Sequence, residues 1–248
     1  MDDERLSNTG QVSTRSEVAA LIFAIVLPTV VTLAYFVVLV GLPPAIVQAV
    51  YLVLKVVQFG FPAVWVFLIV GDKFRLTKPK PTDLAFAGAF GLLVACAMIA
   101  LALLVLQPTG FLDGPSEAIQ EKLRDLGIDS LVKYVTLSVF YCLAHSLMEE
   151  YYWRWFVFKR LHLRTSLANA ILISSLGFMA HHVIVLAIYF GWDSLATYLL
   201  SACVAIGGAV WAWIYERSDS LYGAWLSHLL VDSGIFSLGL ILAWDMLL

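Results

Sequence analysis

The sequence predicts an all-α fold, a polytopic transmembrane helical bundle with about seven spans. Of its 248 residues, 61% are hydrophobic and only 13% are charged, whereas roughly 25% are charged in a typical soluble domain. Several apolar runs exceed the length of about 18 residues that suffices to cross a bilayer. Short turns such as Gly41-Leu42-Pro43-Pro44 and polar loops separate these runs, which is the pattern of successive membrane-spanning helices.

The chain divides into a polar N-terminal tail, residues 1–17, and an integral membrane domain, residues 18–248. The tail mixes both charge signs and lacks the apolar core of a signal peptide. Within the membrane domain, length and hydrophobicity place the expected spans at 18–40, 45–70, 84–106, 131–158, 167–190, 195–215 and 221–242.

Residues 107–130 form the one long polar connection between spans. Within it, residues 116–126 carry apolar side chains at helical spacing and predict a short amphipathic helix. The pattern fits a helix lying at the membrane interface, and it fits an ordinary surface helix without lipid contact equally well.

Lysine and arginine are concentrated in alternate loops, which predicts the orientation of the chain. The richer side contains the N-terminus, the loop after the second span, the loop after the fourth and the loop at Arg217. We therefore expect a multi-pass protein of a plasma or inner membrane, with the N-terminus in the cytoplasm and the C-terminus outside.

Glu149, Glu150 and Arg154 lie inside the fourth apolar run, in an otherwise aromatic and aliphatic stretch. Each such charge costs roughly 2.5–3.5 kcal/mol at the centre of a membrane helix, so a functional role is the default interpretation. Glu150 and Arg154 are four residues apart and can pair on one helix face. His145 has the same spacing from Glu149 and could tune that carboxylate.

Two further runs carry polar residues at helical spacing. Phe178 precedes His182 by four residues in the fifth run, and His228 precedes Asp232 by four in the seventh. At about 1.5 Å of rise per residue, all three runs place these residues between the cytoplasmic half and the middle of the membrane. Polar residues at one depth are less costly when they share one hydrated cavity.

This constellation resembles the CPBP family of intramembrane proteases (CaaX prenyl endopeptidase and bacteriocin-processing, also called Abi). The family pattern places three motifs on separate transmembrane helices, and here they occur in order within a protease-like core of about residues 131–245. The motifs are Glu149-Glu150-x-x-x-Arg154, Phe178-x-x-x-His182 and His228-x-x-x-Asp232.

The resemblance implies an intramembrane endopeptidase that hydrolyses a peptide bond near the C-terminus or the membrane-proximal part of its substrate. Glu149 would act as the general base that activates water. His182 would position the water or polarise the scissile carbonyl, and His228 and Asp232 would stabilise the oxyanion. The implied catalytic set is Glu149, Glu150, His182, His228 and Asp232, with Arg154 and Phe178 as structural support.

The resemblance favours a glutamic-type reaction with no cofactor, and zinc stays open as the alternative. If the reaction depends on a metal, Glu149, His182 and His228 would be the ligands. The sequence lacks the His-Glu-x-x-His helix that would indicate zinc directly. The expected partners are a protein or peptide substrate, lipidated in some relatives, and membrane lipid; nucleic acid is not expected.

Two other functions are compatible with buried ionisable residues. A proton-coupled membrane transporter would use them as a relay, although such a relay should extend to both membrane faces. A non-catalytic membrane scaffold derived from the protease family would retain them without reaction. Beside the family position, His181 points about 100° away from His182 on a helix and is expected to be a bystander unless it replaces its neighbour.

Overall fold

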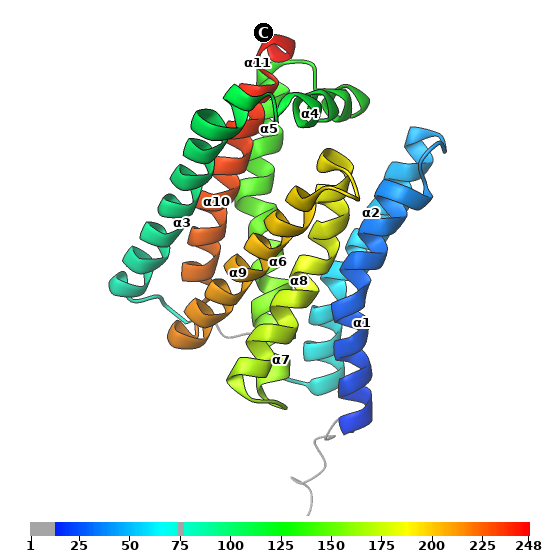
Figure 1. Ribbon diagram of the computed structural model, residues 1–248. Coiled ribbons are helices and arrows are strands. Elements are labelled where there is room, and N and C mark those ends of the chain that lie inside the picture. The colour runs from blue at the N-terminus through cyan, green and yellow to red at the C-terminus, as the bar shows by residue number, and fades with distance from the viewer. Residues whose placement is uncertain (1–12, 74–76) are drawn as a thin grey trace, which may run out of the picture.

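The computed structural model describes residues 13–73 and 77–248. Most of the predicted N-terminal tail, including Arg5, and part of the basic loop, including Arg75, lie outside these residues. Over the described chain the prediction of an all-α transmembrane bundle is confirmed: seven helical segments are long and apolar enough to cross a membrane. The segments lie side by side in one bundle (Figure 1).

Three spans precede the polar connection. Each begins as an α-helix and ends in wider π-helical turns or, for the third, a final 3-10 turn. Their elements are α1 (Thr14–Leu33) and η1 (Ala34–Val38); α2 (Pro44–Ala63) and η2 (Val64–Val70); and α3 (Pro81–Leu101), η3 (Ala102–Leu106) and η4 (Gln107–Thr109).

The fourth span is one continuous helix, Leu131–His162, that changes its winding several times. A π-helix forms i→i+5 hydrogen bonds, and short π segments inside α-helices often occur at functional sites. Here two of them enclose the α-helical turn that carries both motif glutamates. The elements are α5 (Leu131–Val139), η5 (Phe140–His145), α6 (Ser146–Glu150), η6 (Tyr151–Phe158) and α7 (Lys159–His162).

Three regular α-helices form the remaining spans. In the structure α10 packs along α3, α9 packs along α8, and α1 packs on the other side of α8 (Figure 1). A short helix, α11 (Trp244–Leu247), ends the chain. The three spans are α8 (Leu167–Phe190), α9 (Leu195–Ser218) and α10 (Leu221–Leu242).

The first helix begins at Thr14, four residues before the predicted start of the membrane domain. Ser13 caps it, because its Oγ accepts a hydrogen bond from the Ser16 amide at 3.1 Å. Glu17 is buried and forms ion pairs with Arg160 and Arg164. A polar segment can therefore continue a membrane helix where basic side chains of another helix neutralise its carboxylate.

The predicted amphipathic helix is present as α4 (Asp113–Asp125). The Ser116 hydroxyl and the Gln120 side-chain amide donate hydrogen bonds to the Leu242 carbonyl at 2.8 and 3.1 Å. Leu123 is buried in a small cluster with Tyr134. The helix therefore packs on the end of α10, close to α11 and the C-terminus (Figure 1).

At the opposite end of the bundle, ion pairs connect loops that are distant in the sequence. Arg160 lies 3.5 Å from Glu17 and 3.9 Å from Asp72, and Lys159 lies 3.4 Å from Asp219. The loops that the sequence assigned to one basic side therefore share one end of the molecule. Which side of the membrane this end faces stays a prediction.

Candidate active site

The two adjacent glutamates on α6 are both buried, with exposed fractions of 6% for Glu149 and 0% for Glu150. Neighbouring residues of an α-helix point about 100° apart, so the two carboxylates point in different directions. Their surroundings differ in distance and in chemistry, and each is described in turn.

The Glu150 carboxylate is tightly held. Its Oε1 accepts a hydrogen bond from His228 Nδ1 at 2.8 Å and lies 3.2 Å from Arg154 Nη1. Arg154 in turn donates from Nη2 to the Gly208 carbonyl at 3.2 Å. These contacts join α6, η6, α9 and α10 around one buried charge pair, as the i,i+4 spacing of Glu150 and Arg154 predicted.

Aromatic rings enclose the Arg154 guanidinium. Its Cζ lies 4.9 Å from the Phe178 ring centroid and 5.2 Å from that of Trp211, which are cation–π distances. Trp211 also stacks on the His228 ring at 4.0 Å, and its Nε1 donates to Ser227 Oγ at 3.0 Å. Trp211 therefore holds two motif residues in place, although no pattern in the sequence identified it.

The Glu149 carboxylate faces three imidazoles at longer distances. Its Oε1 lies 3.5 Å from His145 Nε2 and 3.6 Å from His181 Nε2. Its Oε2 lies 3.6 Å from His228 Nε2. The helices η5, α8 and α10 each supply one of these rings, and of the three rings only His228 belongs to a motif of the sequence.

His228 connects the surroundings of both glutamates. Its Nδ1 donates to Glu150, because an ionised carboxylate only accepts hydrogen bonds. Its Nε2 points to the other side, 3.6 Å from both Glu149 Oε2 and Asp232 Oδ1. Carboxylates of α6 and α10 thus both approach this nitrogen.

His182 occupies the family position but differs from the other rings in its contacts. Its Nδ1 lies 2.8 Å from the Phe178 carbonyl, and because a carbonyl only accepts, Nδ1 must carry the proton. In the neutral ring Nε2 is then a free acceptor. The Phe178 side chain packs against it at 4.6 Å between centroids, the adjacency that the spacing predicted.

His181 is placed differently from the bystander that we expected. It is buried, its Nε2 contacts Glu149, and its ring stacks on Trp153 with 5.9 Å between centroids and 5° between planes. The rings of His181 and His182 lie 4.2 Å apart. The family motif marks only the second of the two, so the motif alone could not show that both border the site.

The residues expected as ligands if the reaction depends on a metal are Glu149, His182 and His228. Among the residues that the structure describes, no group of three or more His, Cys, Asp and Glu side chains is arranged to hold a metal ion. His182 directs Nδ1 to a backbone carbonyl, which leaves Nε2 as its free nitrogen, and Glu149 contacts His181. We therefore derive no step of the chemistry through a metal.

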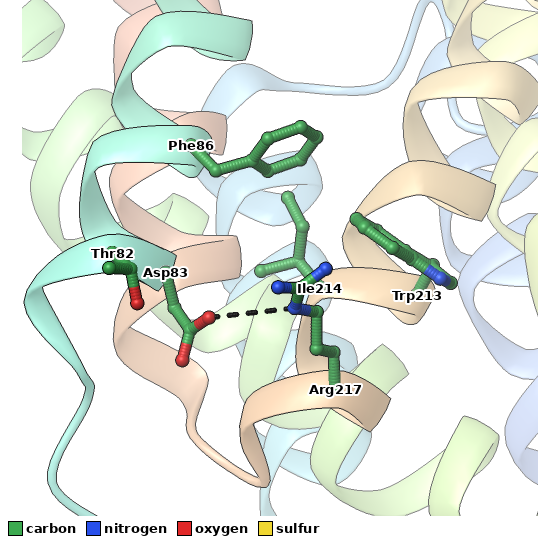
Figure 2. Close-up of a pocket in the computed structure, with 6 residues that line it drawn as sticks. All are labelled: Thr82, Asp83, Phe86, Trp213, Ile214 and Arg217. Carbon is green, nitrogen blue, oxygen red and sulfur yellow. Dashed lines mark ion pairs between the residues drawn. The ribbon is translucent and has the colours of Figure 1, made fainter.

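Two cavities lie outside this cluster. A groove of about 340 Å³ runs between α5, η5 and α10, and Leu229 and Ser233, which flank Asp232 along the helix, line it. A smaller cleft of about 50 Å³ lies where α3 begins and α9 ends (Figure 2). Asp83 and Arg217 form an ion pair there at 3.6 Å, and no motif residue is among its lining residues.

Comparison with known proteins gives one match. The family model described as Rce1-like, Type II CAAX prenyl endopeptidase, matches residues 131–234. This region contains all three motifs, from Glu149 to Asp232, so the resemblance seen in the sequence is confirmed. No match was found among the curated proteins or the solved structures.

Proposed function

Because residues 131–234 belong to the Rce1-like family of Type II CAAX prenyl endopeptidases, we propose that this membrane protein is a glutamic-type intramembrane endopeptidase. It hydrolyses a peptide bond near the C-terminus or in the membrane-proximal part of a protein substrate. The observation that carries the proposal is the buried Glu149 carboxylate, which faces three imidazoles while Asp232 lies beside one of them.

In the proposed reaction, Glu149 takes a proton from a water molecule as the water oxygen attacks the scissile carbonyl carbon. The carbonyl π electrons move to oxygen and form a tetrahedral oxyanion. Glu149 then gives the proton to the departing amine nitrogen as the C–N bond breaks. The products are a carboxylic acid and an amine, and the enzyme returns to its starting state.

The neighbouring side chains have distinct tasks in this scheme. The free Nε2 of His182 accepts a hydrogen bond from the attacking water and so orients its lone pair. His228 stabilises the oxyanion, which requires a proton on Nε2 in addition to the one that Nδ1 donates to Glu150. Asp232, 3.6 Å from that nitrogen, stabilises the positive charge that the second proton creates.

The proposed substrate is a membrane-tethered protein tail, and the family description, CAAX prenyl endopeptidase, makes a lipidated tail the first candidate. The tail enters from the cytoplasm or laterally from the inner leaflet. This route assumes the orientation given by the basic loops, with the N-terminus in the cytoplasm. The orientation can be tested with cysteines engineered near the site. If only reagents in the outer compartment label them, the orientation is the reverse of the one assumed here.

The decisive experiment measures cleavage of fluorogenic membrane-tail peptides by the purified protein in detergent, with and without a chelator. We expect cleavage by wild type that survives the chelator and is lost in Glu149→Gln and His182→Ala. His162, on α7 at the end of the bundle, provides the matched control, since His162→Ala removes an imidazole outside the site. Full activity in folded Glu149→Gln would overturn the proposal. If the chelator abolishes wild-type activity and added zinc restores it, a metal-dependent mechanism would replace the glutamic one.

A further inference from the structure

The two oxygens of the Glu149 carboxylate have separate partners. His145 and His181 both approach Oε1, at 3.5 and 3.6 Å, while His228 approaches Oε2 at 3.6 Å. The rings come from η5, α8 and α10, so they reach the carboxylate from three directions. Neither His145 nor His181 belongs to the family motifs.

Both rings at Oε1 are fixed by aromatic contacts. The His145 ring packs against Tyr141 at 4.8 Å and against Phe59 of α2 at 6.1 Å. The His181 ring lies parallel to Trp153. Imidazoles held in this way keep their position beside the Glu149 carboxylate. This preorganisation lowers the entropy lost when the reactive geometry forms.

We propose that His145 and His181 are positioning residues that hold Glu149 by Oε1 and thereby present Oε2 as the oxygen that takes the proton from water. This inference rests on the proposed function. The assignment follows from the geometry, because Oε2 is the oxygen on the side of His228 and Asp232, where the oxyanion forms. A carboxylate free to rotate would direct either oxygen to the water and would lose the reactive alignment.

The His181 ring supports the assignment from its second nitrogen. Its Nδ1 is buried without a hydrogen-bond partner in the described residues, so the ring meets a polar group only through Nε2. A neutral ring with its proton on Nε2 donates toward Glu149 and leaves on Nδ1 a lone pair, which is less costly to bury than an unpaired N–H. This tautomer directs the proton to Oε1.

The test uses matched substitutions at both positions. Leucine removes the nitrogen and keeps the bulk, whereas glutamine restores an N–H near the position of Nε2. In the peptide cleavage assay, kcat falls about 10- to 100-fold in His145→Leu and His181→Leu, the size expected for a misplaced reactive group. KM stays unchanged, and His145→Gln and His181→Gln recover most of kcat. The His162→Ala control retains wild-type kcat and KM.

A spectroscopic readout makes the test independent of turnover. The infrared difference spectrum between wild type and Glu149→Gln isolates the stretching bands of the Glu149 carboxylate, whose frequencies depend on the partners of each oxygen. Relative to wild type, we expect these bands to shift in both leucine variants and to stay unchanged in His162→Ala. If a leucine variant does not fold, the carboxylate bands and the kcat of the glutamine variant at the same position test the positioning role.

The outcomes separate this inference from the proposed function. Cleavage by wild type, loss in Glu149→Gln and unchanged kcat with unchanged carboxylate bands in both leucine variants would overturn the positioning role and leave the peptidase intact. Equal activity of wild type and Glu149→Gln would instead reject the peptidase mechanism, while shifted bands would still show that the two histidines hold the carboxylate.

Discussion

Glu149 and Glu150 are neighbours in the chain, yet their surroundings are opposites. Glu150 is fully buried and has partners at 2.8 and 3.2 Å, one of them a guanidinium. Glu149 has three imidazole partners, none closer than 3.5 Å. The first arrangement has the short contacts of a strong ionic hydrogen-bond network, whereas the second surrounds its carboxylate with imidazoles at longer distances and with no fixed positive charge.

The difference indicates how the protein separates structure from chemistry. A buried carboxylate with a bidentate-capable arginine beside it connects helices and loses much of its stabilisation if it moves. A general base must accept and release a proton, and partners that themselves carry exchangeable protons suit that task. We infer that Glu150 and Arg154 fix α6 so that Glu149 can react.

The largest effect on activity is expected for Glu149→Gln. Removing a general base lowers kcat by about 10²- to 10⁴-fold, while the thermal unfolding midpoint in detergent changes little because only contacts of 3.5 Å or more are lost. Peptide cleavage and circular dichroism melting check both halves of this prediction. A large drop in the midpoint would show that Glu149, like its neighbour, is structural.

The next largest effect is expected for Glu150→Gln, and it is an effect on stability. The substitution leaves the Arg154 guanidinium buried without its counter-charge, which costs about 3–5 kcal/mol of folding free energy. The control is the double variant Glu150→Gln/Arg154→Met, which removes both charges and should recover part of that loss. Unfolding in detergent measures it, and an unchanged midpoint in the single variant would contradict the division between the two carboxylates.

The sequence was sufficient for the fold and for two of the residue pairs in the candidate site. Hydrophobic run length set the seven spans, and i,i+4 spacing identified the Glu150–Arg154 and His228–Asp232 pairs that the structure brings into contact. Spacing along one helix says nothing about how helices rotate against each other. The contact between His181 and Glu149 depends on the rotation of α8 relative to α6, so only the structure could reveal it.

The π-helical segments explain a second gap in the sequence analysis. They change the direction in which successive side chains point, because the hydrogen bonds run from i to i+5. Regular helical geometry therefore does not predict where η6 directs Trp153, although the i,i+4 contact between His145 and Glu149 that the sequence suggested is present at 3.5 Å. Trp211 was missed for a different reason: one tryptophan among eight in the sequence carries no pattern that links it to His228.

A third prediction compares two close helix contacts, one on each side of the site. A Cβ added at Gly177 would lie 2.9 Å from Trp153 Cζ3, in the indole that stacks on His181, whereas one at Gly208 would lie 3.3 Å from Phe178 Cδ1 and 3.4 Å from Arg154 Nη2. Alanine favours a helix by about 1 kcal/mol over glycine, and overpacking costs about 1–3 kcal/mol.

We therefore expect Gly177→Ala to destabilise the protein and to lower kcat, because the rigid indole must move. Gly208→Ala should stay close to wild type in stability, since the small shift of its neighbours offsets the gain in helix propensity. Melting curves and peptide cleavage of the two variants measure the difference. Equal behaviour of both would show that the Glu149 side of the site tolerates displacement as well as the Glu150 side does.

The smallest effect on stability is expected for a substitution of Asp129, whose pair with Lys133 has the same i,i+4 spacing as Glu150 and Arg154. The two side chains are 2.7 Å apart but 71% and 51% exposed, so solvent screens their attraction. The hydrogen bond from Lys133 lowers the pKa of Asp129. Because the folded state binds the proton less tightly than the unfolded state, the pair stabilises the fold fully above the ordinary pKa of aspartate and loses this effect as pH falls through the lowered pKa of the folded state.

Asp129→Asn should therefore shift the unfolding midpoint by about 1 °C or less at pH 7 and by nothing measurable at a pH below the lowered pKa of Asp129. Melting of wild type and variant at both values provides the measurement, with Glu150→Gln as the buried counterpart of equal spacing. A shift at Asp129 as large as that of Glu150→Gln would mean that spacing rather than burial sets the strength of these pairs. That result would remove the physical basis for treating Glu150 as the structural carboxylate.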